Sequence, residues 1–263
     1  MAAPKPDVLV DGLDLGEAPR VDDQGRVWFT NVLGGGVYRW SEGGDVETMV
    51  PKRKGVGGLA LHEDGGVVIS GRDIVHVQPD GTNRFLFAAP EGVTGFNDIC
   101  ATTEGHLLVG GLRFRPFAGD PPVPGSFWYV TAPEHGEVVL DDVLWPNGVG
   151  DAGEGVWCFC DYARGQLTIE GGHSPRHVVR TPNGEADGLA IDGEGGIWVA
   201  LAGGEALARY TQAGELTDTL ELPGHIVTSV AFDGDATMYV TTRAALLRLP
   251  APVPGPRHHL CRI

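Results

Sequence analysis

Short apolar runs recur along the chain at a nearly constant spacing. Each run follows a glycine-containing turn, and six of them align at residues 27–29, 67–69, 107–109, 156–158, 197–199 and 238–240. Short apolar runs that are bounded by turn residues are typical of buried strands, whereas a helix needs a longer apolar periodicity. No helical period of useful length accompanies them. The pattern therefore predicts an all-β protein.

In each repeat, one residue of the segment that precedes the apolar run marks the same phase of a longer repeat. These positions are Glu17, Gly57, Asn97, Asn147, Asp187 and Thr228, and subtraction gives intervals of 40, 40, 50, 40 and 41 residues. A period near forty residues, with several short strands in each unit, indicates a β-propeller. We therefore expect residues 1–263 to form a single six-bladed β-propeller with four-stranded blades.

The apolar segment at residues 7–10 precedes the first repeat and has the pattern of a strand. We expect this N-terminal strand to complete the sixth blade as its outer strand. Pairing the two ends of the chain in this way closes the ring and leaves no blade short of a strand.

Charge and composition narrow the class of partner. The formal net charge is −16, from 19 basic and 35 acidic residues, which argues against nucleic acid or an anionic membrane surface as a partner. The N-terminal residues lack the apolar core of a signal peptide, and no apolar run is long enough to span a membrane. We expect a cytoplasmic monomer or small homo-oligomer that acts on a small molecule.

The cysteines and the C-terminal histidines do not suggest a site. The four cysteines have neither a disulfide framework nor zinc-ligand spacing, so we expect buried free thiols. His258 and His259 lie close to the C-terminus, and we expect them to be exposed.

Equivalent positions of propeller blades converge on one axis, so the residues at the repeat positions should lie close together. Two carboxylates and two amides would then lie at one level of a narrow channel, from Glu17, Asn97, Asn147 and Asp187. Two crowded carboxylates repel each other unless a cation lies between them. Oxygen ligands favour a hard divalent cation, Ca²⁺ first, with Mg²⁺, Mn²⁺, Zn²⁺ and Fe²⁺ left open. A purely structural ion or a hydrogen-bonded polar plug is the alternative.

A proline-rich insertion at residues 113–125 explains the single long interval. Long loops in compact domains are usually functional, so we expect this one at the channel mouth, where Arg113 and Arg115 would bind a polar substrate. A solvated loop is the alternative. The basic segment 51–54 is a second candidate for binding a substrate anion, although charge runs usually lie on the solvated surface.

Four short motifs occur in order at the blade spacing: Gly16-Glu17-Ala18-Pro19, Asn97-Asp98, Pro146-Asn147-Gly148 and Asp187-Gly188. In these motifs the chain resembles the regucalcin/gluconolactonase family of six-bladed propellers. The resemblance implies a metal held by Glu17, Asn147 and Asp187, with Asn97 close to metal and substrate, and a hydrolase of lactones or related esters. Many sugar lactonases of the family carry an arginine where this chain has Gly95, which argues against an aldonolactone substrate.

These residues suggest metal-assisted hydrolysis. The cation would polarise the ester carbonyl, Asp187 would act as general base toward a water, and Asn97 would orient the carbonyl or the water. A serine hydrolase of the α/β class is excluded because no Gly-x-Ser-x-Gly elbow occurs. Two other functions stay open: a phosphotriesterase-like hydrolase that uses the same metal, and a non-catalytic propeller that binds a metabolite or calcium.

Overall fold

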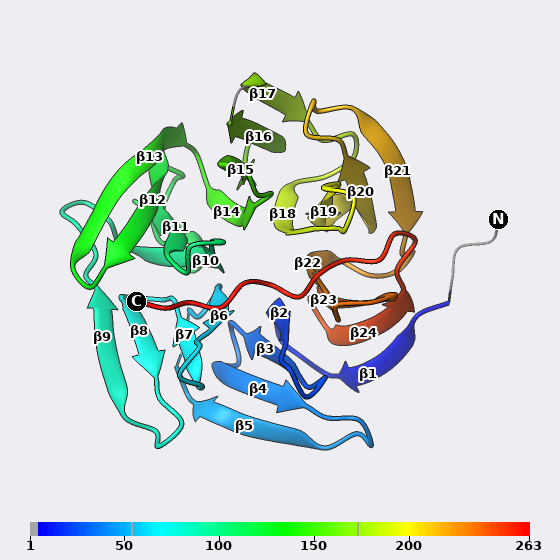
Figure 1. The fold of residues 1–263 in the computed structure, drawn as a ribbon, viewed down its shortest axis with the longest axis horizontal. Coiled ribbons are helices and arrows are strands. Elements are labelled where there is room, and N and C mark those ends of the chain that lie inside the picture. The colour runs from blue at the N-terminus through cyan, green and yellow to red at the C-terminus, as the bar shows by residue number, and fades with distance from the viewer. Residues whose placement is uncertain (1–4, 54, 173) are drawn as a thin grey trace.

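Six antiparallel sheets of four strands surround a central axis in the computed structural model, which describes residues 5–53, 55–172 and 174–263 (Figure 1). This arrangement confirms the predicted six-bladed β-propeller with four-stranded blades. Within the described ranges, helix is confined to two 3₁₀ turns, η1 (Pro116–Ala118) and η2 (Ala202–Gly204). None of the described helices is long and apolar enough to cross a membrane.

Each blade begins with its innermost strand, and the chain then moves outward. The strands of the first three blades are β2 (Gly16–Val21), β3 (Val27–Asn31), β4 (Gly36–Trp40), β5 (Val46–Pro51), β6 (Leu59–Leu61), β7 (Val67–Ile69), β8 (Ile74–Val77), β9 (Asn83–Phe87), β10 (Gly95–Ala101), β11 (Leu107–Leu112), β12 (Gly125–Ala132) and β13 (His135–Val143). The other three contain β14 (Pro146–Asp151), β15 (Val156–Asp161), β16 (Gln166–Gly171), β17 (Ser174–Arg180), β18 (Ala186–Ile191), β19 (Ile197–Leu201), β20 (Ala206–Tyr210), β21 (Leu216–Glu221), β22 (Val227–Phe232), β23 (Thr237–Thr242), β24 (Ala245–Pro250) and β1 (Asp7–Asp11).

The sixth blade takes strands from both ends of the chain, as the sequence predicted. β1 pairs antiparallel with β24, from Asp7 opposite Arg248 to Asp11 opposite Ala245. Arg248 reinforces this joint, since its guanidinium lies 3.3 Å from a carboxylate oxygen of Asp7 and 2.9 Å from one of Glu42 in the first blade. The ring is therefore closed by backbone pairing and by ion pairs at the same place.

Neighbouring blades pack face to face through the apolar strand runs. Between the fifth and sixth blades, for example, Trp198 and Leu207 lie in one cluster with Val230, Phe232 and Val240, and all five side chains are fully buried. Burial of large apolar side chains is the main stabilising term in such a fold. The four cysteines are buried free thiols, as expected.

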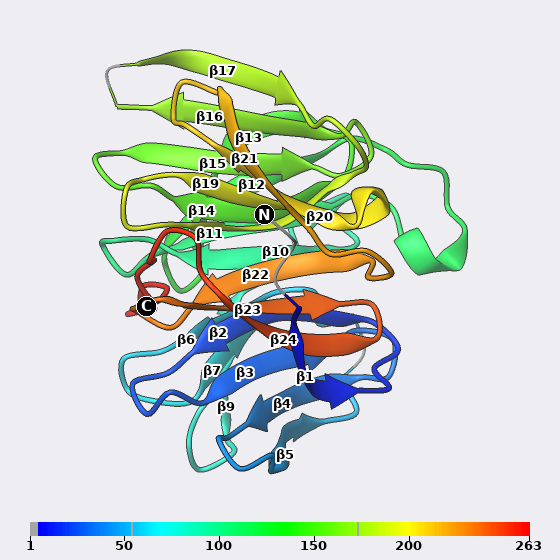
Figure 2. The same cartoon turned by 90° about the vertical axis from the view of Figure 1, so that its right-hand side faces the viewer.

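The C-terminal tail, residues 251–263, crosses the face of the ring opposite to η1 and η2 (Figures 1 and 2). Its end is held by the second and third blades, because the backbone of Cys261 bonds to that of Leu61 at 2.8 Å and Arg262 N–H donates to the Gly105 carbonyl at 2.8 Å. Arg84 donates to the Ile263 carbonyl oxygen at 2.7 Å. The tail therefore covers one end of the axial channel.

Asp192 organises the turn that follows the inner strand of the fifth blade. Its buried carboxylate accepts hydrogen bonds from Gly196 N–H at 2.8 Å, Trp198 Nε1–H at 2.9 Å and Arg209 Nε–H at 2.6 Å. Burial alone would raise the pKa of Asp192, but the hydrogen bonds from Arg209 and the turn outweigh it and hold the pKa below its usual value. In the first blade Asp22 accepts equivalent bonds from Arg26 and Trp28.

We predict that Asp192→Asn destabilises the fold by about 3 kcal/mol at pH 7, because it breaks a buried, fully hydrogen-bonded charge pair. Since the folded-state pKa is depressed, this contribution exists above the unfolded-state pKa of about 3.9 and disappears as the pH falls through the lower folded-state value. Urea denaturation at several pH values measures it. The exposed Asp45→Asn serves as the control, and an Asp192→Asn variant as stable as Asp45→Asn would refute the role of the carboxylate.

Candidate active site

A cavity of about 760 Å³ opens on the face that carries η1 and η2. Its lining includes Glu17, Asn97, Asn147, Asp187 and Thr228, which are five of the six repeat positions. Each of them lies near the start of an innermost strand, on β2, β10, β14, β18 and β22 respectively. The four residues that the sequence singled out for a metal or substrate site therefore come together in one cavity.

A shift in strand register lies at or directly after each of these five positions. The pairing of the inner strand with its neighbour slips between Glu17 and Arg20 on β2, and the same irregularity occurs on the other four strands. Such bulges bend a strand and re-aim its side chains, and they are common beside active sites. The bulges explain how side chains at the start of flat strands turn into the axial cavity.

Glycines next to the polar residues let the inner strands approach each other closely. A Cβ at Gly148 would overlap the carbonyl of Asp187, and a Cβ at Gly188 would overlap the side chain of Ser229. The glycines that follow Asn147 and Asp187 in the sequence are therefore required by the narrow axis.

Asp187 is the most enclosed carboxylate of the cavity, with 4% of its surface exposed, and Asn147 beside it is 7% exposed. Within the described residues, Oδ1 of Asp187 has no hydrogen-bond partner. Burial raises the pKa of Asp187 well above its usual value, and the charge of Asp98 adds to this effect, while the Asn147 amide opposes it. Burial likewise raises the pKa of Glu17, with the charges of Asp187 and Asp98 adding to it.

A buried ion pair accompanies these carboxylates. Burial raises the pKa of Asp98 to about 6, although the Arg20 guanidinium, 3.8 Å away, acts in the opposite direction. Arg20 also donates to the carbonyls of Pro19 at 2.7 Å and Ile99 at 2.9 Å. Arg20 is thus committed to Asp98 and to the backbone, and in the described part of the chain Glu17 and Asp187 form no ion pair with a basic side chain.

Asn97 is held in place by its neighbours. Its Nδ2 donates a hydrogen bond to the Pro146 carbonyl at 3.0 Å. Its Oδ1 lies against Gly57, where any Cβ would overlap it. The second repeat position, Gly57, is thus a glycine because the Asn97 amide takes the space that a side chain would need.

The donor set fits a hard divalent cation. Two carboxylates whose pKa values are raised by burial and by neighbouring negative charges gain from a positive charge between them, and amide oxygens complete such a shell. Among the described residues, no three His, Cys, Asp or Glu side chains come close enough to hold a metal by themselves. Glu17, Asn147 and Asp187 would therefore have to act as a mixed carboxylate and amide set.

The two arginines that the sequence predicted for substrate binding, Arg113 and Arg115, differ in their position relative to the cavity. The insertion does reach the cavity, since Pro116, Phe117 and Ala118 of η1 line it. Arg115 lines it as well, but its guanidinium makes two bonds to Asp120, at 2.8 and 3.0 Å. Arg113 is exposed and lies outside the lining.

The basic segment 51–54 does not line the cavity in the residues that are described, which exclude Lys54. Arg53 instead pairs with Asp73 at 2.6 Å. The lining does contain two exposed arginines that the sequence reasoning missed, Arg72 and Arg243. Both lie in the loop that follows the second strand of a blade, which is the same point of the repeat as the insertion at 113–125.

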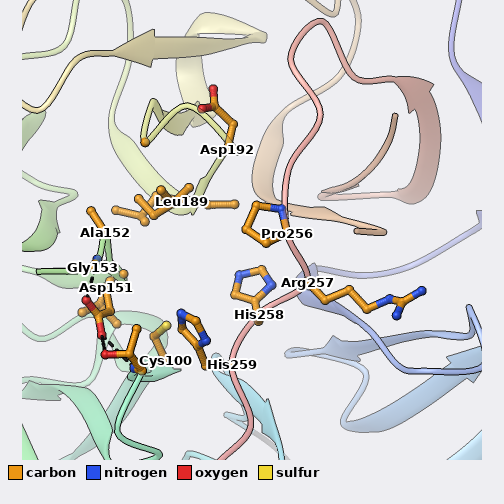
Figure 3. Close-up of a pocket in the computed structure, with 17 residues that line it drawn as sticks. Cys100, Asp151, Ala152, Gly153, Leu189, Asp192, Pro256, Arg257, His258 and His259 are labelled. Atoms are coloured by element: carbon orange, nitrogen blue, oxygen red, sulfur yellow. Dashed lines mark hydrogen bonds between the residues drawn. The ribbon is translucent and has the colours of Figure 1, made fainter. Parts of the chain in front are cut away.

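A smaller cavity of about 330 Å³ lies beneath the C-terminal tail (Figure 3). Asp151 there accepts hydrogen bonds from Thr103 N–H at 2.8 Å and Gly153 N–H at 2.9 Å. Burial raises the pKa of the Cys100 thiol to about 11 and lowers the pKa of His258 well below its usual value. The expectation that His258 is exposed is wrong, because the tail carries it to the end of the channel; His259 is exposed. We assign the candidate site to the larger cavity.

Fold and site together define a six-bladed propeller with an oxygen-lined axial cavity. The family model described as SMP-30/Gluconolactonase/LRE-like region matches residues 15–244, and the chain belongs to this family. It is 25% identical to the L-arabinolactonase of Azospirillum brasilense over 87% of this chain and 80% of that protein. It is 27% identical to the 6-deoxy-6-sulfogluconolactonase of Pseudomonas putida over 87% and 83%.

A solved structure shares the fold. The calcium-binding protein regucalcin from Agrobacterium tumefaciens matches with a TM-score of 0.85 and 21% identity, over 99% of this chain and 98% of that chain. The family resemblance drawn from the sequence motifs is confirmed.

We predict that Glu17→Gln raises the melting temperature in the presence of a chelator and abolishes the further rise that we expect Ca²⁺ to cause in the wild type. The neutral isostere removes one of two repelling charges, and each kcal/mol relieved corresponds to roughly 2–4 °C in a domain of this size. Differential scanning calorimetry with and without Ca²⁺ measures both effects. Glu91→Gln, at an exposed position outside the cavity, is the control. A Glu17→Gln variant that keeps the full calcium response would contradict the assignment.

Proposed function

We propose that this protein is a hydrolase of small lactones or related esters that depends on a divalent cation. The observation that carries the proposal is the convergence of Glu17, Asn97, Asn147 and Asp187 in one cavity large enough for a small molecule. Family relatives that are named as lactonases support the substrate class.

Glu17, Asn147 and Asp187 would hold the cation, and their oxygen donors favour Ca²⁺. A relative by fold is described as a calcium-binding protein, which supports the same ion. When bound, the cation supplies polarisation of the lactone carbonyl and stabilisation of the negative charge that develops on its oxygen.

Asp187 is suited to move the proton. One of its oxygens is buried and without a hydrogen-bond partner in the described residues, so it is an acceptor for a proton of the attacking water. The water oxygen then bonds to the carbonyl carbon as the ring C–O bond breaks. The proton ends on the leaving alkoxide, so that one lactone and one water yield one hydroxy acid.

Asn97 would orient the reactants without exchanging a proton. Its amide is fixed between the Pro146 carbonyl and Gly57, so it presents a rigid polar group at the floor of the cavity. A fixed hydrogen-bonding group at the reacting centre lowers the cost of aligning carbonyl and water.

The experiment that tests the proposal is turnover of a panel of small lactones by chelator-stripped protein. Ca²⁺, Mg²⁺, Mn²⁺, Zn²⁺ and Fe²⁺ are added back one at a time, and we expect at least one ion to restore hydrolysis, Ca²⁺ best. Lack of turnover with every ion, although an ion still raises the melting temperature, would contradict the proposal. That result would favour a phosphotriester substrate or a binding protein.

We predict that Asp187→Asn lowers kcat by roughly 10²–10⁴-fold, the usual contribution of a general base, while the fold is retained. Steady-state kinetics and circular dichroism measure the two quantities. Glu185→Gln is the matched control, because this carboxylate is two residues away, lies outside the cavity lining and accepts a hydrogen bond from Gly203 N–H at 3.1 Å. Loss of activity that is equal in both variants would show that only the local negative charge matters.

A further inference from the structure

We infer that the lactone accepted by this cavity carries an apolar group, an alkyl chain or an aryl ring, and is not a polyhydroxylated sugar lactone. The inference rests on the proposed function and concerns which substrate the same site selects. It comes from the walls above the axial residues, which are built by loops of several blades.

These walls are mainly apolar and partly aromatic. Side chains from the first and third blades and from the segments before the first, fourth and sixth blades contribute: Leu15, Val32, Phe114, Phe117, Trp145 and Ile226. Phe114 meets Trp145 edge to face at 5.3 Å between ring centroids, and Trp145 lies 4.7 Å from Tyr162. Three aromatic rings thus form one continuous wall that reaches from the insertion to the fourth blade.

Three hydroxyl groups line the cavity, on Thr94, Tyr162 and Thr228, and those of the two threonines are already used by the protein. Thr94 donates its hydroxyl proton to the backbone, with carbonyl acceptors at Phe114, 2.8 Å away, and Leu112, 3.2 Å away. Thr228 donates to the Gly16 carbonyl at 2.6 Å. Position 95, where a side chain on β10 could offer donors, is a glycine.

The three arginines of the lining, Arg72, Arg115 and Arg243, are all exposed, and Arg115 is paired with Asp120. A lactone with several hydroxyl groups would therefore lose water from these groups and regain few hydrogen bonds from buried side chains. Each such loss weakens binding roughly tenfold or more, which selects against sugar lactones.

Phe117 completes the apolar surface from above. It is 63% exposed although it lines the cavity, and it sits on η1 in the loop that protrudes beside the mouth (Figure 2). Asp120 accepts the Arg115 backbone N–H at 3.1 Å as well as its guanidinium, and these bonds close the turn around η1. A large apolar side chain that is presented in this way gains burial only when an apolar ligand covers it.

Two measurements on the wild-type protein, with the divalent cation present, test the inference. We expect kcat/KM for dihydrocoumarin and γ-nonanolactone to exceed that for D-glucono-1,5-lactone and L-arabinono-1,4-lactone at least tenfold. Calorimetry with lactams, which are not hydrolysed, separates binding from turnover. We expect 3,4-dihydroquinolin-2-one to bind at least tenfold tighter than D-gluconolactam.

The outcomes separate the inference from the proposed function. Turnover with a preference for the sugar lactones would overturn the inference and leave the hydrolase function intact. Tighter binding of the apolar lactam without turnover of any lactone would refute the hydrolase function and support the apolar selectivity of the cavity. Tighter binding of the gluconolactam would overturn the inference whether or not turnover occurs.

We predict that Phe117→Ala raises KM for dihydrocoumarin about tenfold, with kcat within twofold of wild type and no change for the sugar lactones, because only ligand burial is lost. Phe117→Leu should recover most of the loss. Phe85→Ala, which removes a phenylalanine that is 46% exposed on the outer strand β9, is the matched control. Unchanged kinetics in Phe117→Ala would show that the insertion does not contact the substrate.

Discussion

The repulsion between Glu17 and Asp187 is the interaction on which the functional part of the structure depends. Both carboxylates are directed into the axial cavity, burial raises both pKa values, and the nearby Arg20 is committed to Asp98 and the backbone. A fold tolerates such a cluster only if the rest of its stability is secure. The closed ring and the apolar contacts between blades provide it. The cation proposed for this cavity is the simplest way to turn the repulsion into binding energy.

Chemistry and selectivity come from different parts of the repeat. The axial residues belong to innermost strands, where register shifts turn their side chains inward and close strand packing fixes them. The cavity walls come from the loops around the mouth, which differ in length and composition from blade to blade. Loops of this kind vary without disturbing the core. A wall rich in Phe114, Phe117 and Trp145 is therefore compatible with membership of a family that includes sugar lactonases.

The sequence was informative about structural features that follow from a pattern along the chain. The forty-residue period predicted the six blades, the apolar run at 7–10 predicted the closing strand, and the repeat phase predicted that Glu17, Asn97, Asn147 and Asp187 meet. It was less informative where the outcome depends on how the loops fold and on which side chains pair within or between them. The pairing of Arg115 with Asp120 and of Arg53 with Asp73, and the path that carries His258 under the channel, depend on loop conformations that no period encodes.

The most direct test of the axial cation is a crystal structure of the protein grown with Mn²⁺, measured with anomalous diffraction. We predict a single strong anomalous peak in the cavity of about 760 Å³, at coordination distance from oxygens of Glu17, Asn147 and Asp187. A well-ordered cavity without a peak, or a peak beneath the C-terminal tail near Asp151 and His258 instead, would contradict it.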